Sequence, residues 1–211
     1  MLASQRGRML GAMADAVATK GYAGTTVADV VAGAGVSRKT FYEHFRDKEE
    51  CFLAAFDTGV DILLAAIVGA SPDGGDDTWV GLMRARVRAY LDTLASKPAF
   101  ARTFLIEVFA AGPLALERRA EVLRRFATLF RDLHEEARRQ FPLLPPVPEP
   151  IYVAAVGAIN ELVSDFTREG RTGDLPELED TLVYLQVALF AGRDTAADLG
   201  LGAQQQTAHL S

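Results

Sequence analysis

A glycine corner between two short apolar helices constrains the fold of this chain more than any other feature of its sequence. In the segment TTVADVVAGAGVSRKTFYEHF, residues 25–45, Thr26 is followed three residues later by Asp29, a spacing typical of a capping box at a helix start. Gly35 fits a left-handed corner, and Ser37 fits the cap of the helix that follows. The segment therefore predicts helix, tight turn and helix, which is the helix-turn-helix arrangement.

The second of these helices has two contrasting faces. At 100° per residue, Phe41 and Phe45 fall on one face, which we expect to pack against the preceding helices. The opposite face presents Lys39 and Glu43, flanked by Tyr42. Such side chains suit a DNA groove, because Lys pairs with guanine edges and Glu accepts from cytosine. The alternative is a weak surface ion pair beside a half-buried aromatic ring.

The charge of the chain is unevenly distributed. Residues 1–48 contain seven Lys and Arg against four Asp and Glu, a balance of +3, whereas the whole chain carries −6. A basic head therefore precedes an acidic body. This asymmetry indicates that the head meets a polyanion, although a chance fluctuation on a solvated surface gives the same numbers.

Helical periodicity continues through the rest of the sequence and predicts an all-α fold. The expected helices cover residues 7–20, 48–70, 78–96, 114–140 and 151–166, with a short one in FARTFLIEVFAAG that Gly112 closes and a last one in TLVYLQVALFAG. We expect a helix-turn-helix domain at 1–47, a helical body for effector binding and dimerisation at 48–195, and a flexible tail at 196–211. The long helix from Lys48 should join head and body.

Two helices near the end of the sequence are apolar around much of their circumference. Ile151, Ala155, Ala158, Leu162 and Phe166 form one stripe of the first, and Tyr152, Val156, Ile159 and Val163 form a second, overlapping stripe. A helix of this kind needs two burial partners. The subunit core and a second subunit are one solution, which predicts a two-fold homodimer. Complete enclosure within one core is the alternative.

The segment TTVADVVAGAGVSRKTFYEHFRDKEE closely resembles the DNA-binding head of TetR-type transcriptional regulators. The resemblance implies a regulator, most often a repressor, that binds a palindromic operator in double-stranded DNA as a homodimer through its last two helices and is released by a small-molecule effector. It also implies which residues contact DNA: Thr26, Ser37, Arg38, Lys39, Thr40, Tyr42, His44 and Lys48. For Thr26, simple helix capping is a second role that is compatible with the first.

The body contains residues suited to the wall of an effector pocket. The candidates are Trp79, Tyr90, Phe104, Glu107, Phe126, Phe130 and Asn160. A carboxylate such as Glu107 within FLIEVFAAG is costly to bury unless it is paired. It fits either an effector contact or an ion pair with Arg102, Arg118 or Arg119, and aromatic residues at helical spacing fit plain core as well.

Sequence features of catalysis and of cofactor sites are sparse. Three scattered histidines, with no second ligand at metal spacing near His134, predict no metal site. No phosphate-cradling glycine loop or nucleophile elbow appears, so we expect neither an enzyme nor a cofactor. The alternative to a regulator is a helical interaction module or an enzyme that has lost DNA binding. One cysteine, no signal-peptide pattern and no clean membrane span favour the cytoplasm and no membrane contact.

Overall fold

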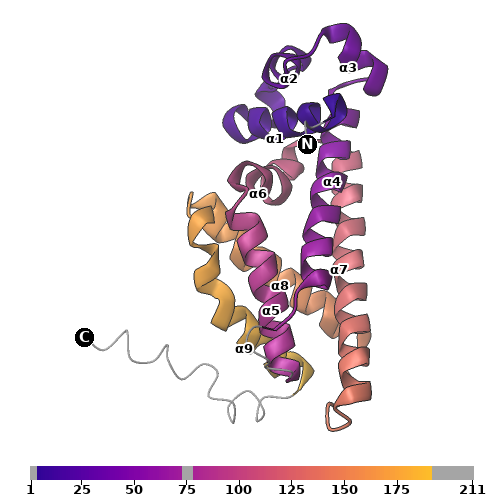
Figure 1. The fold of residues 1–211 in the computed structure, drawn as a ribbon, viewed down its shortest axis with the longest axis vertical. Helices are drawn as coiled ribbons and strands as arrows, with labels where there is room; N and C mark the ends of the chain where they lie inside the picture. The colour runs from indigo at the N-terminus through magenta and orange to yellow at the C-terminus, as the bar shows by residue number, and fades with distance from the viewer. Residues whose placement is uncertain (1–3, 73–77, 192–211) are drawn as a thin grey trace, which may run out of the picture.

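A computed structural model describes residues 4–72 and 78–191, and all regular secondary structure within these ranges is helical (Figure 1). The predicted all-α fold class is therefore confirmed. The chain forms a small head followed by a longer helical body, and the head lies at one end of the long axis (Figure 1). The tail predicted at 196–211 lies outside the described residues.

Three helices make the head. They are α1 (Gln5–Gly24), α2 (Val27–Ala34) and α3 (Arg38–His44). The sequence placed the end of the first helix at Gly21, and this glycine does interrupt α1 with φ 73° and ψ 162°. A positive φ of this kind is strained for any residue with a side chain, so Gly21 breaks the helix and the last turn of α1 takes a new direction.

The turn between α2 and α3 forms as the sequence predicts. Thr26 and Asp29 form a complete capping box, in which the backbone N–H of Asp29 donates to the Thr26 hydroxyl and the backbone N–H of Thr26 donates to the Asp29 carboxylate. Gly35 adopts the left-handed conformation, with φ 62° and ψ 42°. The Ser37 hydroxyl then accepts from the backbone N–H of Thr40 at 3.0 Å and caps α3.

The body consists of six α-helices and two short 3₁₀ segments within the described residues. They are α4 (Lys48–Gly69), α5 (Trp79–Ala95), α6 (Pro98–Leu105), η2 (Glu107–Ala110), α7 (Pro113–Gln140), α8 (Glu149–Arg168), η3 (Thr172–Leu178) and α9 (Glu179–Phe190). The long helix α4 leads from the head into the body, α7 runs beside it, and α6 lies between the head and the remaining helices (Figure 1).

Helix α4 is the only described helix that is long and apolar enough, by length and composition, to cross a membrane. Its apolar face is instead used within the fold, since Phe52, Phe56 and Leu63 are buried. Ion pairs on its solvent side connect it to α7, from Arg118 to Asp57 at 3.2 Å and from Arg125 to Asp61 at 2.8 Å. The helix therefore serves as the central strut of a packed bundle.

Two segments differ from the sequence prediction. The apolar stretch expected as one helix divides into α6 and η2, because the helical ladder ends at Leu105 and tightens into a 3₁₀ turn from Glu107. The segment η3, with Pro176 inside it, was not predicted, because a short 3₁₀ run carries no period-3.6 pattern. It buries Leu175 and Leu178 under the body and so sets the start of α9.

Candidate DNA-binding surface and effector pocket

Helix α3 is held in the head by its aromatic face. Phe41 and Phe45 are both buried, and their ring centroids lie 5.6 Å apart. Phe41 also contacts Tyr42 edge to face at 5.4 Å. The predicted buried face is confirmed, and it fixes the rotation of α3 so that the residues between the two phenylalanines face solvent.

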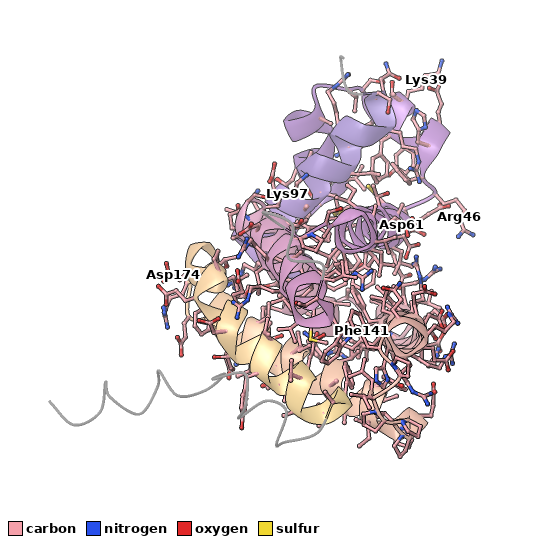
Figure 2. The ribbon with its side chains drawn as sticks, turned by 60° about the horizontal axis from the view of Figure 1, so that its bottom comes forward. Lys39, Arg46, Asp61, Lys97, Phe141 and Asp174 are labelled. Atoms are coloured by element: carbon pink, nitrogen blue, oxygen red, sulfur yellow. The ribbon has the colours of Figure 1, made fainter. Side chains whose placement is uncertain are left out.

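The other side of α3 is open. Lys39 lies at the outer surface of the head (Figure 2), and Tyr42 is 56% exposed rather than half buried in the core. Lys39 and Glu43 form the i,i+4 pair at 4.0 Å, with side chains 87% and 57% exposed. A pair so exposed contributes little to stability, so both side chains remain available to another molecule. Six of the eight candidate DNA contacts are exposed: Thr26, Ser37, Arg38, Lys39, Tyr42 and His44.

Three hydroxyl-bearing candidates also have structural partners. The Thr26 hydroxyl donates to the Asp29 carboxylate at 2.8 Å, and the hydroxyls of Ser37 and Thr40 lie 3.0 Å apart. Lys20 pairs with the same carboxylate, which holds the pKa of Asp29 at about 2. These bonds orient the first turns of α2 and α3, whose free N–H groups favour an anion such as phosphate.

Lys48 occupies a different setting from the other candidates. It is half buried, its Nζ donates to the backbone carbonyl of Tyr22 at 2.8 Å, and the same ammonium lies 4.1 Å from the Tyr22 ring centroid. This contact attaches the end of α1 to the start of α4, and the phosphate contact expected at Lys48 stays a prediction. This partner could not be predicted from local sequence patterns, because Lys48 and Tyr22 are 26 positions apart.

A second contact joins the same point of the head to the body. The backbone N–H of Tyr22 donates to Glu107 Oε2 at 3.2 Å, and Glu107 Oε1 pairs with Arg102 Nη2 at 3.3 Å. We call the set formed by Tyr22, Lys48 and Glu107 the Tyr22 clasp. The break at Gly21 makes it possible, since a Cβ built at that glycine lies only 3.4 Å from Glu107 Oε2.

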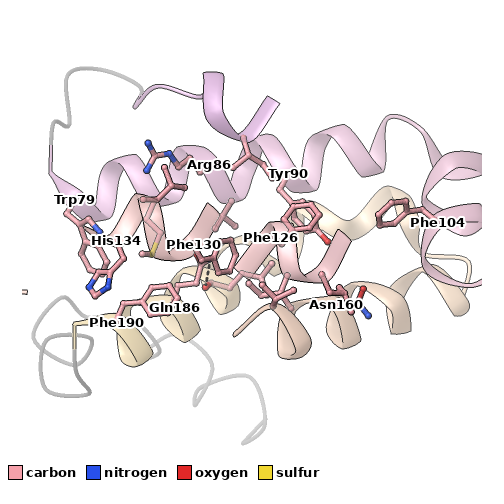
Figure 3. A pocket seen from close by; sticks show the side chains of 18 residues that line it. Trp79, Arg86, Tyr90, Phe104, Phe126, Phe130, His134, Asn160, Gln186 and Phe190 are labelled. Carbon is pink, nitrogen blue, oxygen red and sulfur yellow. Dashed lines mark hydrogen bonds between the residues drawn. The ribbon is translucent and has the colours of Figure 1, made fainter. Parts of the chain in front are cut away.

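The body encloses a cavity of about 80 Å³ between α5, α7, α8 and α9 (Figure 3). Its wall is largely aromatic and aliphatic. The residues that the sequence predicted for it and that do line it are Trp79, Tyr90, Phe104, Phe126, Phe130 and Asn160. An apolar cavity with a few polar groups is the usual form of a small-molecule site. Burial raises the pKa of Tyr90, so its phenol stays protonated and neutral.

Glu107, which the sequence offered as a candidate effector contact, is not among the residues that line this cavity. Its carboxylate faces the head and binds Arg102 and the Tyr22 backbone. The alternative weighed for this residue, an ion pair with Arg102, is the one that the structure contains. The cost of burying a carboxylate on an apolar segment is offset here by an ion pair and a backbone hydrogen bond that lie outside the cavity.

Four polar or aromatic wall residues were missed by the sequence analysis. They are Arg86, His134, Gln186 and Phe190. His134 is buried, its Nδ1 is 2.8 Å from the Tyr152 hydroxyl, and its ring stacks on Phe190 at 5.4 Å. Burial, followed by the charge of Arg138, lowers the pKa of His134. Arg86 comes from the alternating run RARVR, whose spacing puts Arg86 on a different helical face from Arg84 and Arg88.

No group of three or more His, Cys, Asp and Glu side chains within residues 4–72 and 78–191 is placed to hold a metal ion. Cys51 is buried, and burial raises the pKa of its thiol to about 12. A thiol in this state is a packing residue rather than a nucleophile.

Comparison with known proteins agrees with this geometry. Residues 11–55 match the family described as bacterial regulatory proteins, tetR family. No curated protein matches the chain. A bacterial regulatory protein in the tetR family from Rhodococcus RHA1 is 25% identical with a TM-score of 0.67, and the match covers 89% of this chain and 97% of that one.

Two regulators named FadR share the fold, and the first is described as a fatty acid degradation regulator. FadR from Bacillus halodurans is 18% identical with a TM-score of 0.72, and the match covers 89% of this chain and 96% of that one. FadR from Bacillus subtilis, solved in complex with stearoyl-CoA, is 16% identical with a TM-score of 0.70 and coverages of 86% and 97%. The N-terminal domain of this protein therefore belongs to the tetR family of bacterial regulatory proteins, and the described chain has the fold of that family's regulators.

Proposed function

We propose that this protein is a cytoplasmic, ligand-responsive transcriptional regulator. It binds a palindromic operator in double-stranded DNA as a homodimer and represses transcription. A small-molecule effector that binds in the body releases it from the DNA. The observation that carries this proposal is the open face of α3, where Lys39 and Tyr42 project from a helix whose opposite face is locked by buried Phe41 and Phe45. No observation favours the alternative of an interaction module or an enzyme.

The DNA contacts follow from the arrangement of the head. Arg38, Lys39 and Thr40 lie in the first turn of α3, the part of a recognition helix that reads base edges. Tyr42 and His44 follow on the exposed side and suit phosphates at the groove edge, and Thr26 presents the start of α2 to the backbone. These side chains define a short reading surface, and one head alone meets only one half-site.

A second copy of the chain supplies the head that binds the other half-site. Val153 of α8 is 57% exposed, and Ala154, Gly157 and Ala158 lie beside it on the same exposed face. On α9, Tyr184 is also exposed. Small and apolar side chains on an open face permit close helix packing, so we propose a two-fold dimer through α8 and α9. The buried stripe that contains Tyr152 and Val163 supplies the contacts within one subunit.

The cavity is connected to the head by side chains as well as by α4. Phe104 lines the cavity and stacks on Phe56 with centroids 4.5 Å apart and an interplanar angle of 13°. Phe56 contacts Phe52, which meets the Tyr22 ring edge to face at 4.9 Å. An effector that displaces Phe104 therefore changes the support of the Tyr22 clasp and of α4 together. The effector must prefer the state that does not bind DNA, because equal affinity shifts nothing.

Fluorescence anisotropy tests the proposal. Purified protein is titrated onto labelled DNA that flanks its own gene and onto a scrambled duplex, over a range of salt. We expect tighter binding to the flanking DNA and a steep loss of affinity with salt, because paired heads displace counterions from several phosphates. Equal, weak binding to both duplexes, followed by a selection from genomic fragments that yields no preferred site, would overturn the proposal.

Substitutions on α3 locate the contact. Lys39→Ala and Tyr42→Ala should each weaken operator binding while the unfolding midpoint stays unchanged, since both side chains are exposed. Arg124→Ala is the matched control, because Arg124 lies on the exposed side of α7 and pairs only with Glu121 at 2.7 Å. Loss of affinity in the control as large as in the α3 variants would mean that general charge, and not α3, carries the binding.

A further inference from the structure

The central part of α5 carries three arginines with two different environments. Arg84 donates to Glu179 at 2.7 Å and to Asp180 at 2.6 Å, and Arg88 donates to Glu179 at 2.8 Å. These pairs attach α5 to the start of α9. Arg86 lies between them in sequence but turns to the other side, where it lines the cavity (Figure 3).

Arg86 has no counter-charge in the part of the chain that the structure describes. Its Nε is buried without a hydrogen-bond partner. Burial alone lowers the pKa of its guanidinium, with no acidic group acting in the opposite direction. Leaving a buried donor atom of a cation unpaired costs stability, so Arg86 places at the cavity wall a positive charge that no described residue neutralises.

The rest of the cavity wall is mainly apolar and includes a second hydrogen-bonding side chain, His134. His134 is held neutral by its lowered pKa, and its Nε2 has no hydrogen-bond partner among the described residues. Arg86, Trp79 and His134 lie toward one end of the view in Figure 3, whereas Phe104 and Asn160 lie toward the other. The cavity thus has one cationic end and a long aromatic interior.

We infer that the effector is an amphipathic monoanion, with a carboxylate that pairs with Arg86 and an apolar body that lies along the aromatic wall. The inference rests on the proposed function, because it names the ligand class of the same cavity. An arginine fork matches the two oxygens of a carboxylate. A neutral or cationic ligand of equal length leaves the guanidinium unpaired or repels it.

Intrinsic fluorescence provides the test, because Trp79 is the single tryptophan of the chain and lines the cavity. The probes are octanoate, 1-octanol and octylammonium, which share one chain length and differ in head group. We expect octanoate to change the Trp79 emission at concentrations at least about tenfold lower than the other two. It should also raise the unfolding midpoint, as any ligand of the folded state does.

Variants separate charge from packing. Arg86→Met should weaken octanoate binding about tenfold or more and leave 1-octanol binding unchanged, and Arg86→Lys should retain the preference for octanoate. Arg86→Met should also fold at least as stably as the natural chain, because it removes an unpaired buried charge. Arg124→Gln, on the exposed face of α7, controls for the loss of one positive charge.

Several outcomes would overturn the inference. They are equal binding of octanoate and 1-octanol, undiminished octanoate binding by Arg86→Met, and the absence of any emission change with octanoate. A fourth concerns Asp73, Asp76 and Asp77, which lie outside the described residues. If octanoate bound only after these three were changed to Asn, they, and not a ligand, would be the partners of Arg86. Operator binding without ligand is measured in parallel, so failure here leaves the proposed DNA-binding function separately tested.

Discussion

At the scale of single residues, Tyr22 contacts two separate elements of the body, η2 and α4, through its backbone and its ring. Its N–H binds Glu107 of η2, its carbonyl binds Lys48 of α4, and its ring meets Phe52. All three contacts follow from the positive φ of Gly21, which turns the end of α1 toward the body. These contacts add to the apolar packing of α1 against α4, α6 and η2 in fixing the orientation of the head.

Replacing Glu107 should loosen this attachment. Glu107→Ala removes the acceptor of the Tyr22 N–H and the partner of Arg102. We expect the unfolding free energy in urea to fall by about 1–2 kcal/mol, the usual cost of losing a charged hydrogen-bond partner. Amide exchange at Tyr22 should become faster. Glu117→Ala on the exposed side of α7 is the control. An equal loss of unfolding free energy in this variant would show that the Tyr22 clasp is not the cause of the effect.

His134 should make stability depend on pH. Its pKa is lowered in the folded chain, mainly by burial, whereas an unfolded histidine titrates near about 6.5. Below that pH the unfolded state binds more protons, so stability is complete above it and falls as the pH decreases. Urea unfolding at pH 7.5 and 5.5 should therefore show a larger acid loss in the natural protein than in His134→Gln. Identical losses in both would contradict this reasoning.

At the scale of helices, α4 and α6 approach each other closely at Gly59. A Cβ placed on Gly59 of α4 would lie 1.6 Å from a ring carbon of Phe100. The ring centroid of Phe100 lies 5.4 Å from that of Phe104, the cavity residue that stacks on Phe56. The absence of a side chain at Gly59 thus permits the short distance between α4 and α6.

A methyl group at this crossing should be destabilising. Gly59→Ala gains helix propensity but forces Phe100 out of its place, and we expect a net loss of about 1–2 kcal/mol because overpacking costs more than propensity returns. Gly11→Ala on α1 is the control, since nothing lies within 4 Å of its added Cβ, and it should be neutral or stabilising. Equal effects of the two substitutions on the urea midpoint would show that the α4–α6 contact adapts freely.

The elements of the head could be predicted because their signals are local. Thr26 caps α2 through Asp29 and Ser37 caps α3 through Thr40, each only three residues away, and Phe41 and Phe45 obey helical spacing. The wall aromatics could also be found by type. Arg86 and the Glu107–Tyr22 bond could not, because they depend on which helices meet in three dimensions, over separations such as the 85 residues between Tyr22 and Glu107.

At the scale of the whole molecule, the proposed function needs two heads that act together on DNA, and the proposed dimer interface is the open face of α8. Ala158→Arg places a long cation on this face without touching the core of one subunit, because Ala158 is exposed there. We expect a monomer in light scattering and a loss of operator affinity, since one half-site contact remains. Ala120→Arg on the exposed side of α7 should stay dimeric; a dimer in both variants would place the interface elsewhere.

The most direct test of the central claim is a selection of bound fragments from genomic DNA, performed with the natural protein and with a variant that carries both Lys39→Ala and Tyr42→Ala. The account predicts enrichment of a site with two-fold symmetry by the natural protein and loss of that enrichment by the variant, at unchanged unfolding midpoint. Failure of the natural protein to enrich any site, or equal enrichment by the variant, would contradict a regulator that reads DNA with α3.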